Sequence, residues 1–257
     1  MMRHILVLFG FMCAVALPGN QAFAEAEAAL PSAQSILVAM DHNMLFERRT
    51  STIKMRVEGR RRTRTFEILS YGRGQSDAAM EYLQPLRDRG TKMLKLGEDL
   101  WIYMPTIERT QKISGHMLRQ GMMGSDLSYE DMMATQEMNK MYVSKVKRSE
   151  ELEGRATWVL EMVAKDLSLA YPKRVMWVDK ERSVALKQEL YALSGLLLKV
   201  WSMSKIEKFG PHRYFPTRMV IEDKLKKGSK TILEFSYMNF DVKVPEEVFS
   251  RRWLERR

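Results

Sequence analysis

The alternation of apolar and polar side chains with a period of two residues constrains the fold of this chain more than any other feature. Ile53, Met55 and Val57 alternate with polar residues, and Gly59 and an arginine-rich turn follow them. A second alternating run covers residues 63–71. Because successive side chains of a strand point to opposite faces, the two runs predict a β-hairpin.

Further short runs continue along most of the chain, separated by glycine, proline and acidic turn residues. They predict strands at residues 78–83, 91–96, 100–104, 141–148, 157–164, 174–178, 183–191, 196–208, 217–222 and 231–237. About a dozen short strands with turn-length connections predict one antiparallel sheet that is large enough to curl.

A period of about four residues, typical of helices, occurs in two places. A helix is expected over residues 31–48, where Ile36, Met40 and Met44 recur at this spacing. The second place is residues 183–208, which fit two strands but also a helix, because one helical face would carry Val184, Lys187, Leu190 and Leu193.

The longest break in the strand pattern is residues 110–140, and it overlaps a segment that holds seven methionines between residues 113 and 141. A connection of this length in a compact sheet protein is usually a lid or a binding loop. Ser128 and Asp131 match a capping box, so a short helix is expected to begin near Tyr129. Unbranched methionine side chains adapt to apolar ligands. The segment is therefore predicted to be a helical lid over the curled sheet.

Residues 1–24 have the pattern of an export signal. Arg3 precedes an apolar run over residues 5–17, and cleavage is expected after Ala24. The run is too short for a stable membrane anchor, and no later segment has roughly 18 apolar residues in succession. Cys13, the only cysteine, lies inside the signal. We therefore expect an exported protein whose residues 25–257 form a single domain without disulfides.

The net charge of +10 favours anionic partners. Nucleic acid is not expected among them, because the basic residues are scattered and the chain is predicted to be exported. Solvated strand faces explain most of the charge, and anionic lipid head groups or an acidic membrane partner are the next hypotheses. The densest cationic group is a predicted hairpin tip. It consists of Arg60, Arg61, Arg62 and Arg64. The preferred interpretation is that these side chains are simply solvated. The alternative is that they dock on an anionic membrane or an acidic transporter surface, with binding that weakens as salt is added.

Four segments of the chain resemble the LolA-like family of outer-membrane lipoprotein-sorting proteins. They cover residues 40–62, residues 82–114, GMMGSDLSYEDMM at residues 121–133 and VPEEVFSRRWLERR at residues 244–257. The resemblance implies a mainly β fold of the α+β kind, an unclosed antiparallel β-barrel with a helical lid over an apolar cavity. It also implies a periplasmic carrier of lipid or lipoprotein acyl chains that acts as a monomer, in company with an inner-membrane transporter of the ABC or RND type.

The predicted cavity and lid consist of apolar residues from two strands and from the methionine-rich segment. Alternation places Trp101 and Tyr103 on the opposite face, under a helix or against a membrane partner. An ordinary filled core is the alternative for the strand residues. The predicted lipid-binding residues are Leu94, Leu96, Leu100, Ile102, Met104, Met117, Leu118, Met122, Met123, Leu127, Met132 and Met133.

Other classes of protein remain as alternatives. A Cu(I)-binding protein would use thioether ligands such as Met138 and Met141, with His116 beside Met117. A transporter adaptor without lipid cargo is also compatible with the pattern. An enzyme is not expected: no catalytic residues, metal or cofactor are predicted, since residues 25–257 lack cysteine and no histidine lies in a triad motif such as GxSxG.

Overall fold

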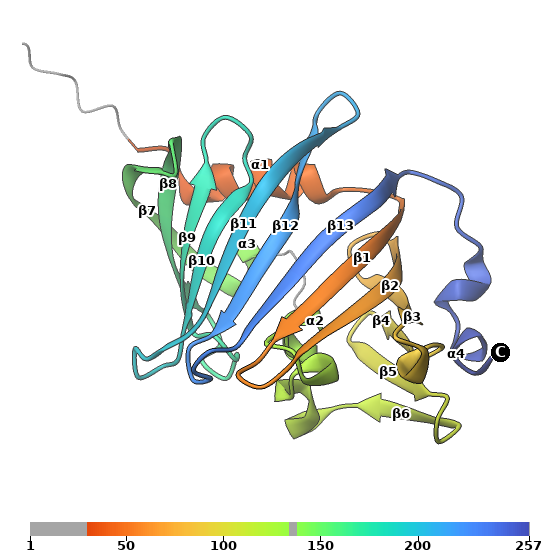
Figure 1. Ribbon diagram of the computed structural model, residues 1–257. Coiled ribbons are helices and arrows are strands. Elements are labelled where there is room, and N and C mark those ends of the chain that lie inside the picture. Colours follow the sequence, from red (N-terminus) through yellow and green to blue (C-terminus); the bar gives the residue numbers. More distant parts are fainter. Residues whose placement is uncertain (1–29, 134–137, 257) are drawn as a thin grey trace, which may run out of the picture.

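The computed structural model describes residues 30–133 and 138–256. The predicted export signal, residues 1–24, lies outside the described residues. Thirteen strands form one antiparallel sheet in the order β6-β5-β4-β3-β2-β1-β13-β12-β11-β10-β9-β8-β7. Figure 1 shows that the sheet curls around its concave face without closing. The predicted fold, an unclosed antiparallel barrel, is confirmed.

The strands follow the predicted pattern closely apart from β6, and short turns join all of the consecutive strands except β6 and β7. They are β1 (Arg48–Glu58), β2 (Thr63–Arg73), β3 (Asp77–Gln84), β4 (Lys92–Leu96), β5 (Asp99–Met104), β6 (Arg109–Ile113), β7 (Tyr142–Leu152), β8 (Arg155–Ala164), β9 (Lys173–Asp179), β10 (Ala185–Tyr191), β11 (Leu197–Phe209), β12 (Arg213–Asp223) and β13 (Lys230–Phe240). Residues 183–208, which also fitted a helix, form β10 and β11. A tight turn separates these two strands, with the Ala192 N–H donating to the Leu196 carbonyl at 2.9 Å.

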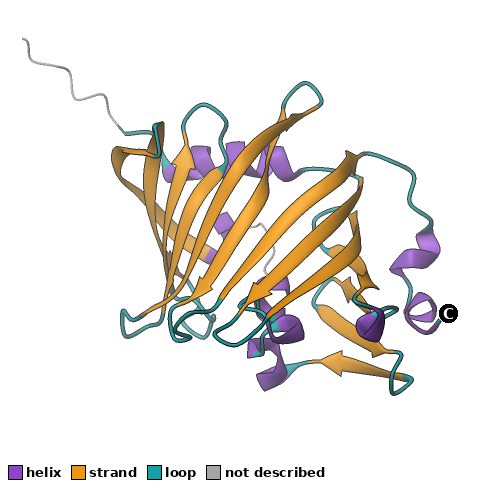
Figure 2. Cartoon of the chain, viewed as in Figure 1, coloured by secondary structure: helices purple, strands orange, loops and turns teal. Residues whose placement is uncertain are grey.

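Helices are few and short, as Figure 2 shows. They are α1 (Ala33–Met44), α2 (Tyr129–Met133), α3 (Met138–Met141), α4 (Arg251–Glu255) and the 3-10 helices η1 (Leu86–Asp88), η2 (Gly115–Arg119), η3 (Met122–Gly124) and η4 (Glu246–Phe249). The expected helix over residues 31–48 ends earlier than predicted, because Arg48 already begins β1. Ser32 caps α1, its hydroxyl accepting from the Ser35 N–H at 3.1 Å. Among the described residues, no helix combines the length and the apolar character that crossing a membrane requires.

The sheet buries apolar side chains on both of its faces. On the concave face, one cluster lies over β1–β5 and a second lies between α1 and β7–β9. A third cluster on the outer face joins β3–β5 to α4 and η4. Trp101 and Tyr103 belong to this third cluster together with Trp253, so they lie on the opposite face as predicted and, of the two predicted surroundings, pack under a helix.

The predicted orientation of Leu94 and Leu96 is wrong. Leu94 pairs directly with Trp101, whereas Met93 pairs with Ile102, so Leu94 points to the outer face and Met93 to the concave face. The sequence could not distinguish the two orientations, because Lys92, Met93, Leu94 and Lys95 are all buried. A strand that is covered on both faces loses the alternation that identifies its inner side.

Candidate ligand-binding site

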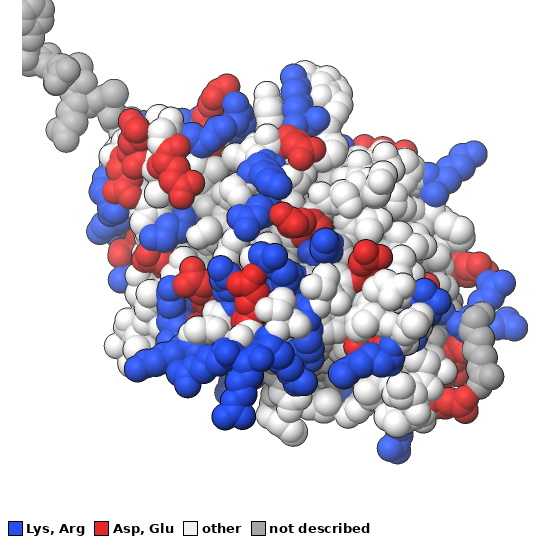
Figure 3. All heavy atoms as spheres, viewed as in Figure 1, with Lys and Arg blue, Asp and Glu red and all other residues white. Residues whose placement is uncertain are grey.

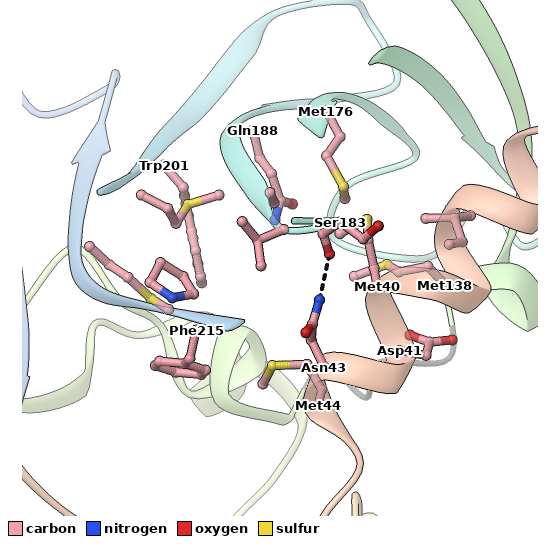
Figure 4. Close-up of a pocket in the computed structure, with 16 residues that line it drawn as sticks. Met40, Asp41, Asn43, Met44, Met138, Met176, Ser183, Gln188, Trp201 and Phe215 are labelled. Carbon is pink, nitrogen blue, oxygen red and sulfur yellow. Dashed lines mark hydrogen bonds between the residues drawn. The ribbon is translucent and has the colours of Figure 1, made fainter. Parts of the chain in front are cut away.

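A cavity of about 170 Å³ lies between α1 and the concave face of β9–β12 (Figure 4). Leu37 of α1 and Met138 of α3 are among the residues that line it. Six methionines line it: Met40, Met44, Met138, Met176, Met203 and Met219. Because unbranched thioether side chains repack at low cost, this wall can change shape without disturbing the strands that carry it.

Asn43 fastens the C-terminal end of α1 to the rim of the sheet. Its side-chain amide donates to the carbonyls of Arg182 and Ser183 at 2.9 and 3.0 Å, and its oxygen accepts from the Tyr214 N–H at 2.7 Å. Figure 4 shows the bond between Asn43 and Ser183 beside the cavity. Asn43 is buried, so these three bonds satisfy a polar group that would otherwise be costly. They hold the roof of the cavity in place.

The cavity has few polar groups, and Trp201 supplies one of them. Its indole ring lines the cavity, and its buried Nε1–H has no hydrogen-bond partner among the described residues. A buried donor without a partner is unusual in a folded protein. This N–H could donate to an ester or carboxyl oxygen of a bound amphiphile.

Arg49 is a cation on the concave face next to the cavity. Its guanidinium centre lies 5.9 Å from the ring of Phe215, which lines the cavity, and 5.0 Å from the ring of Phe46. Burial lowers the pKa of Arg49 to about 10, and no carboxylate among the described residues pairs with it. An uncompensated cation in such surroundings favours an anionic ligand.

Two buried serines lie beside Arg49 on the same face. Ser51 is two residues from Arg49 along β1 and directly opposite Ser70 on β2. Neither hydroxyl, nor the Nε of Arg49, has a hydrogen-bond partner within the described part of the chain. The three groups form what we call the Arg49 cluster, a set of donors that is suited to the oxygens of a phosphate or carboxylate.

The methionine-rich segment covers the concave face of β1–β5, beside the cavity. The predicted capping box is present: the Ser128 hydroxyl accepts from the Asp131 N–H at 3.1 Å, and the Asp131 carboxylate accepts from the Ser128 N–H at 2.7 Å. A bridge between Gly121 and Ser128 folds residues 121–128 into a compact loop. The short helix α2 begins at Tyr129, as predicted.

Buried polar contacts fasten this segment to the sheet. Lys199 of β11 pairs with Asp131 at 2.5 Å, and the Tyr171 hydroxyl donates to the same carboxylate at 2.7 Å. Burial, and next the charge of Asp131, raise the pKa of Tyr171, which therefore stays a hydrogen-bond donor. A second buried carboxylate, Asp126, accepts from the hydroxyls of Ser229 and Thr231. We call these two sets of contacts the latch.

The structure brings most of the predicted lipid-binding residues together, although not around the cavity. One concave-face cluster contains Leu100, Ile102, Met104, Met117, Leu118, Met122, Met123, Leu127, Met132 and Met133. This cluster adjoins the cavity through Trp201 and Met219, but none of the twelve predicted residues lines the cavity itself.

Some of the methionines that line the cavity could have been found from the sequence. Met40 and Met44 recur at the four-residue spacing of a predicted helix. Met176, Met203 and Met219 had no such pattern, because their meeting depends on strand pairing.

The structure also shows where the candidate thioether ligands of the methionine-rich segment lie. Met138 and Met141 both pack in the cluster between α1 and β7–β9, and Met138 also lines the cavity. The Met117 sulfur accepts a hydrogen bond from the Gln111 side chain at 3.4 Å. Within the described ranges, no group of three His, Cys, Asp or Glu residues is arranged to hold a metal ion. The copper hypothesis concerns thioether ligands and stays a prediction.

Comparison with solved structures defines the class of this fold. A DUF1329 family protein from Desulfovibrio piger matches with 24% identity and a TM-score of 0.80, over 86% of this chain and 96% of its own. A domain from Vibrio parahaemolyticus assigned to outer membrane lipoprotein sorting matches with 23% identity and a TM-score of 0.78, over 86% and 97%. A LolA superfamily protein from Nitrosomonas europaea matches with 26% identity and a TM-score of 0.70, over 87% and 100%.

The fold is thus that of the LolA-like proteins, and the resemblance found in the sequence is confirmed. No curated protein matches the chain. A family model described only as "Uncharacterized protein" matches residues 74–256, and the chain belongs to that family.

Proposed function

We propose that this protein is a periplasmic carrier that binds acyl chains of a lipid or lipoprotein in the cavity beneath α1. The observation that carries the proposal is the methionine-lined cavity between α1 and the concave face of β9–β12. An apolar cavity with an adaptable wall and a few polar groups at its side is suited to one end of an amphiphile. Residues 25–257 would act as a single domain after export.

The size of the cavity indicates that it must widen to take its cargo. Its volume of about 170 Å³ is below the roughly 300–1,000 Å³ of most ligand pockets. Each buried CH₂ contributes about 0.8 kcal/mol, so a long acyl chain offers roughly 10 kcal/mol before ordering costs. That amount can drive repacking of the methionines and a small displacement of α1.

Release needs a second event, because burial that holds an acyl chain out of water also opposes its loss. A carrier of this kind therefore works with a partner that opens the cavity. An inner-membrane transporter of the ABC or RND type is the partner that we propose for loading or release. The neighbours assigned to lipoprotein sorting and to the LolA superfamily support a carrier of this general kind.

A variant with a filled cavity tests the proposal. Ala185 lines the cavity, so Ala185→Phe should occupy part of it and weaken the binding of a fluorescent fatty acid several-fold. The matched control is Ala156→Phe, at an exposed position of β8. It should bind like the original chain, and both variants should unfold at similar temperatures.

Cargo that remains bound after purification without detergent provides a second measurement. Mass spectrometry should detect phospholipid or acylated peptide in the original chain and less in Ala185→Phe. A chain that retains no lipid and takes up neither phospholipid nor lipopeptide would contradict the carrier. It would favour an adaptor that contacts a transporter without cargo.

A further inference from the structure

Exposed apolar side chains lie in the turns at one end of the strands, along one rim of the open barrel. In an antiparallel meander, alternate connections lie at the same edge. The register of the strands places six connections at the same end of the strands, and we call this rim of the barrel the leucine edge. They are residues 59–62, 85–91, 105–108, 165–172, 192–196 and 224–229.

Five of these six connections carry a strongly exposed leucine or isoleucine. The residues and their exposed fractions are Leu86 72%, Ile107 59%, Leu167 53%, Leu193 68%, Leu196 55% and Leu225 63%. The connections at the opposite edge, residues 74–76, 97–98, 153–154, 180–184 and 210–212, are fully described and hold no exposed large apolar side chain. Among the turns that join the strands, the exposed aliphatic residues therefore lie at one end of the strands and not at the other.

The charges divide in the same way. The connections of the leucine edge carry nine basic and three acidic residues, a net charge of +6, whereas those of the opposite edge carry two basic and three acidic residues. In Figure 3, lysines and arginines gather along the lower margin of the view, below β13 and the β1–β2 turn. Arg61, Arg62 and Lys227 form no ion pair with any other described residue, so their charges are available to a partner.

The two most basic tips of this edge are held together. The Arg60 Nε donates to the Lys227 carbonyl at 2.9 Å, which joins the β1–β2 turn to the β12–β13 turn. The basic residues of these two turns therefore form one surface, which includes the arginine-rich turn noted in the sequence. Aliphatic side chains set singly on separate tips, among cations, suit shallow insertion into a lipid interface, where apolar contact and charge act together.

We propose that the leucine edge docks reversibly on the surface of an anionic bilayer. The six aliphatic side chains enter the boundary between head groups and acyl chains, and the lysines and arginines contact lipid phosphates. The proposal does not depend on what the cavity holds. It places the sheet upright on the membrane, with α1 toward the far end (Figure 1).

Co-sedimentation with lipid vesicles tests this inference. The full chain should bind vesicles that contain phosphatidylglycerol and phosphatidylcholine, bind phosphatidylcholine alone several-fold less, and lose affinity as salt is added. Two triple variants should each lose most of the binding: Leu193→Ser with Leu196→Ser and Leu225→Ser, and Arg61→Gln with Arg62→Gln and Lys227→Gln.

Matched controls remove the same chemistry from other surfaces. Val143→Ser with Val163→Ser removes exposed apolar residues of β7 and β8, and Lys54→Gln with Lys145→Gln and Lys208→Gln removes exposed strand cations. Both controls should bind vesicles like the original chain. All variants should still bind the fluorescent fatty acid, which separates this inference from the carrier function. Absence of vesicle binding by the original chain, or unchanged binding in either edge variant, would overturn it.

Discussion

Replacing Lys199 with methionine should lower the free energy of unfolding by about 3–5 kcal/mol, because it leaves the buried carboxylate of Asp131 without its cation. The side chain of Asp131 is 1% exposed, so water cannot replace the lost ion pair while the segment stays in place. The carboxylate can reach water if residues 115–133 leave the sheet. Hydrogen exchange should therefore accelerate in this segment before it accelerates in β1–β5.

The same strand offers a matched control for this prediction. Lys205 of β11 pairs with Glu234 at 3.7 Å, but its side chain is 64% exposed, so Lys205→Met should change the stability by less than about 1 kcal/mol. Adding Asp131→Leu to Lys199→Met should recover much of the lost stability, since no buried charge then remains. Unchanged exchange in residues 115–133 of Lys199→Met would show that the ion pair does not hold the segment.

Replacing Arg49 with methionine should change stability and binding in opposite directions. The pKa of Arg49 is lowered because burial disfavours its charged form, and this cost disappears in the variant. Since the variant also loses the contacts with Phe46 and Phe215, its free energy of unfolding should rise by only about 1 kcal/mol. We expect its affinity for an anionic amphiphile, such as a fatty acid, to fall roughly tenfold. Binding of a neutral acyl alcohol of the same length should be unchanged.

Arg56→Met is the control for the Arg49 cluster. Arg56 lies on the same strand, but its side chain is 48% exposed and pairs with Glu58 at 2.9 Å. Calorimetric titration with both ligands and thermal unfolding of the three proteins complete the comparison. If Arg49→Met were less stable and bound both ligands equally well, Arg49 would be a structural residue without a role in head-group recognition.

Most of the strands could be predicted from the sequence, because strands with one buried face keep their alternation. β6 was not predicted and lay within the expected lid. Of its residues Arg109, Thr110, Gln111, Lys112 and Ile113, only the last is apolar and buried. An edge strand of this kind has little apolar pattern to detect. Leu94 was placed on the wrong face for the opposite reason, since its strand is buried on both sides.

The site was predicted less well than the fold, because it depends on contacts between distant parts of the chain. The capping box of α2 is local and could be predicted from Ser128 and Asp131 alone. The latch joins Asp131 to Lys199, which lies 68 positions further along the chain. The cavity likewise needs α1 to cross four strands that occur much later in the sequence. The periodicity of a sequence carries no information about contacts between distant segments. The structure was therefore needed to show that the methionines of α1 and β9–β12 line one cavity.

The two strands that flank the methionine-rich segment, β6 and β7, are consecutive in the sequence but form the two opposite margins of the sheet. The described residues 114–133 and 138–141 lie along the chain between these two margins, and the latch holds the first of these stretches to the sheet. A ligand of the proposed kind that pushed the margins apart would strain the contacts of the latch, because strand pairing fixes β6 and β7 at these margins. The latch, and not the length of the connection, thus couples the separation of the two margins to the seating of the methionine-rich segment.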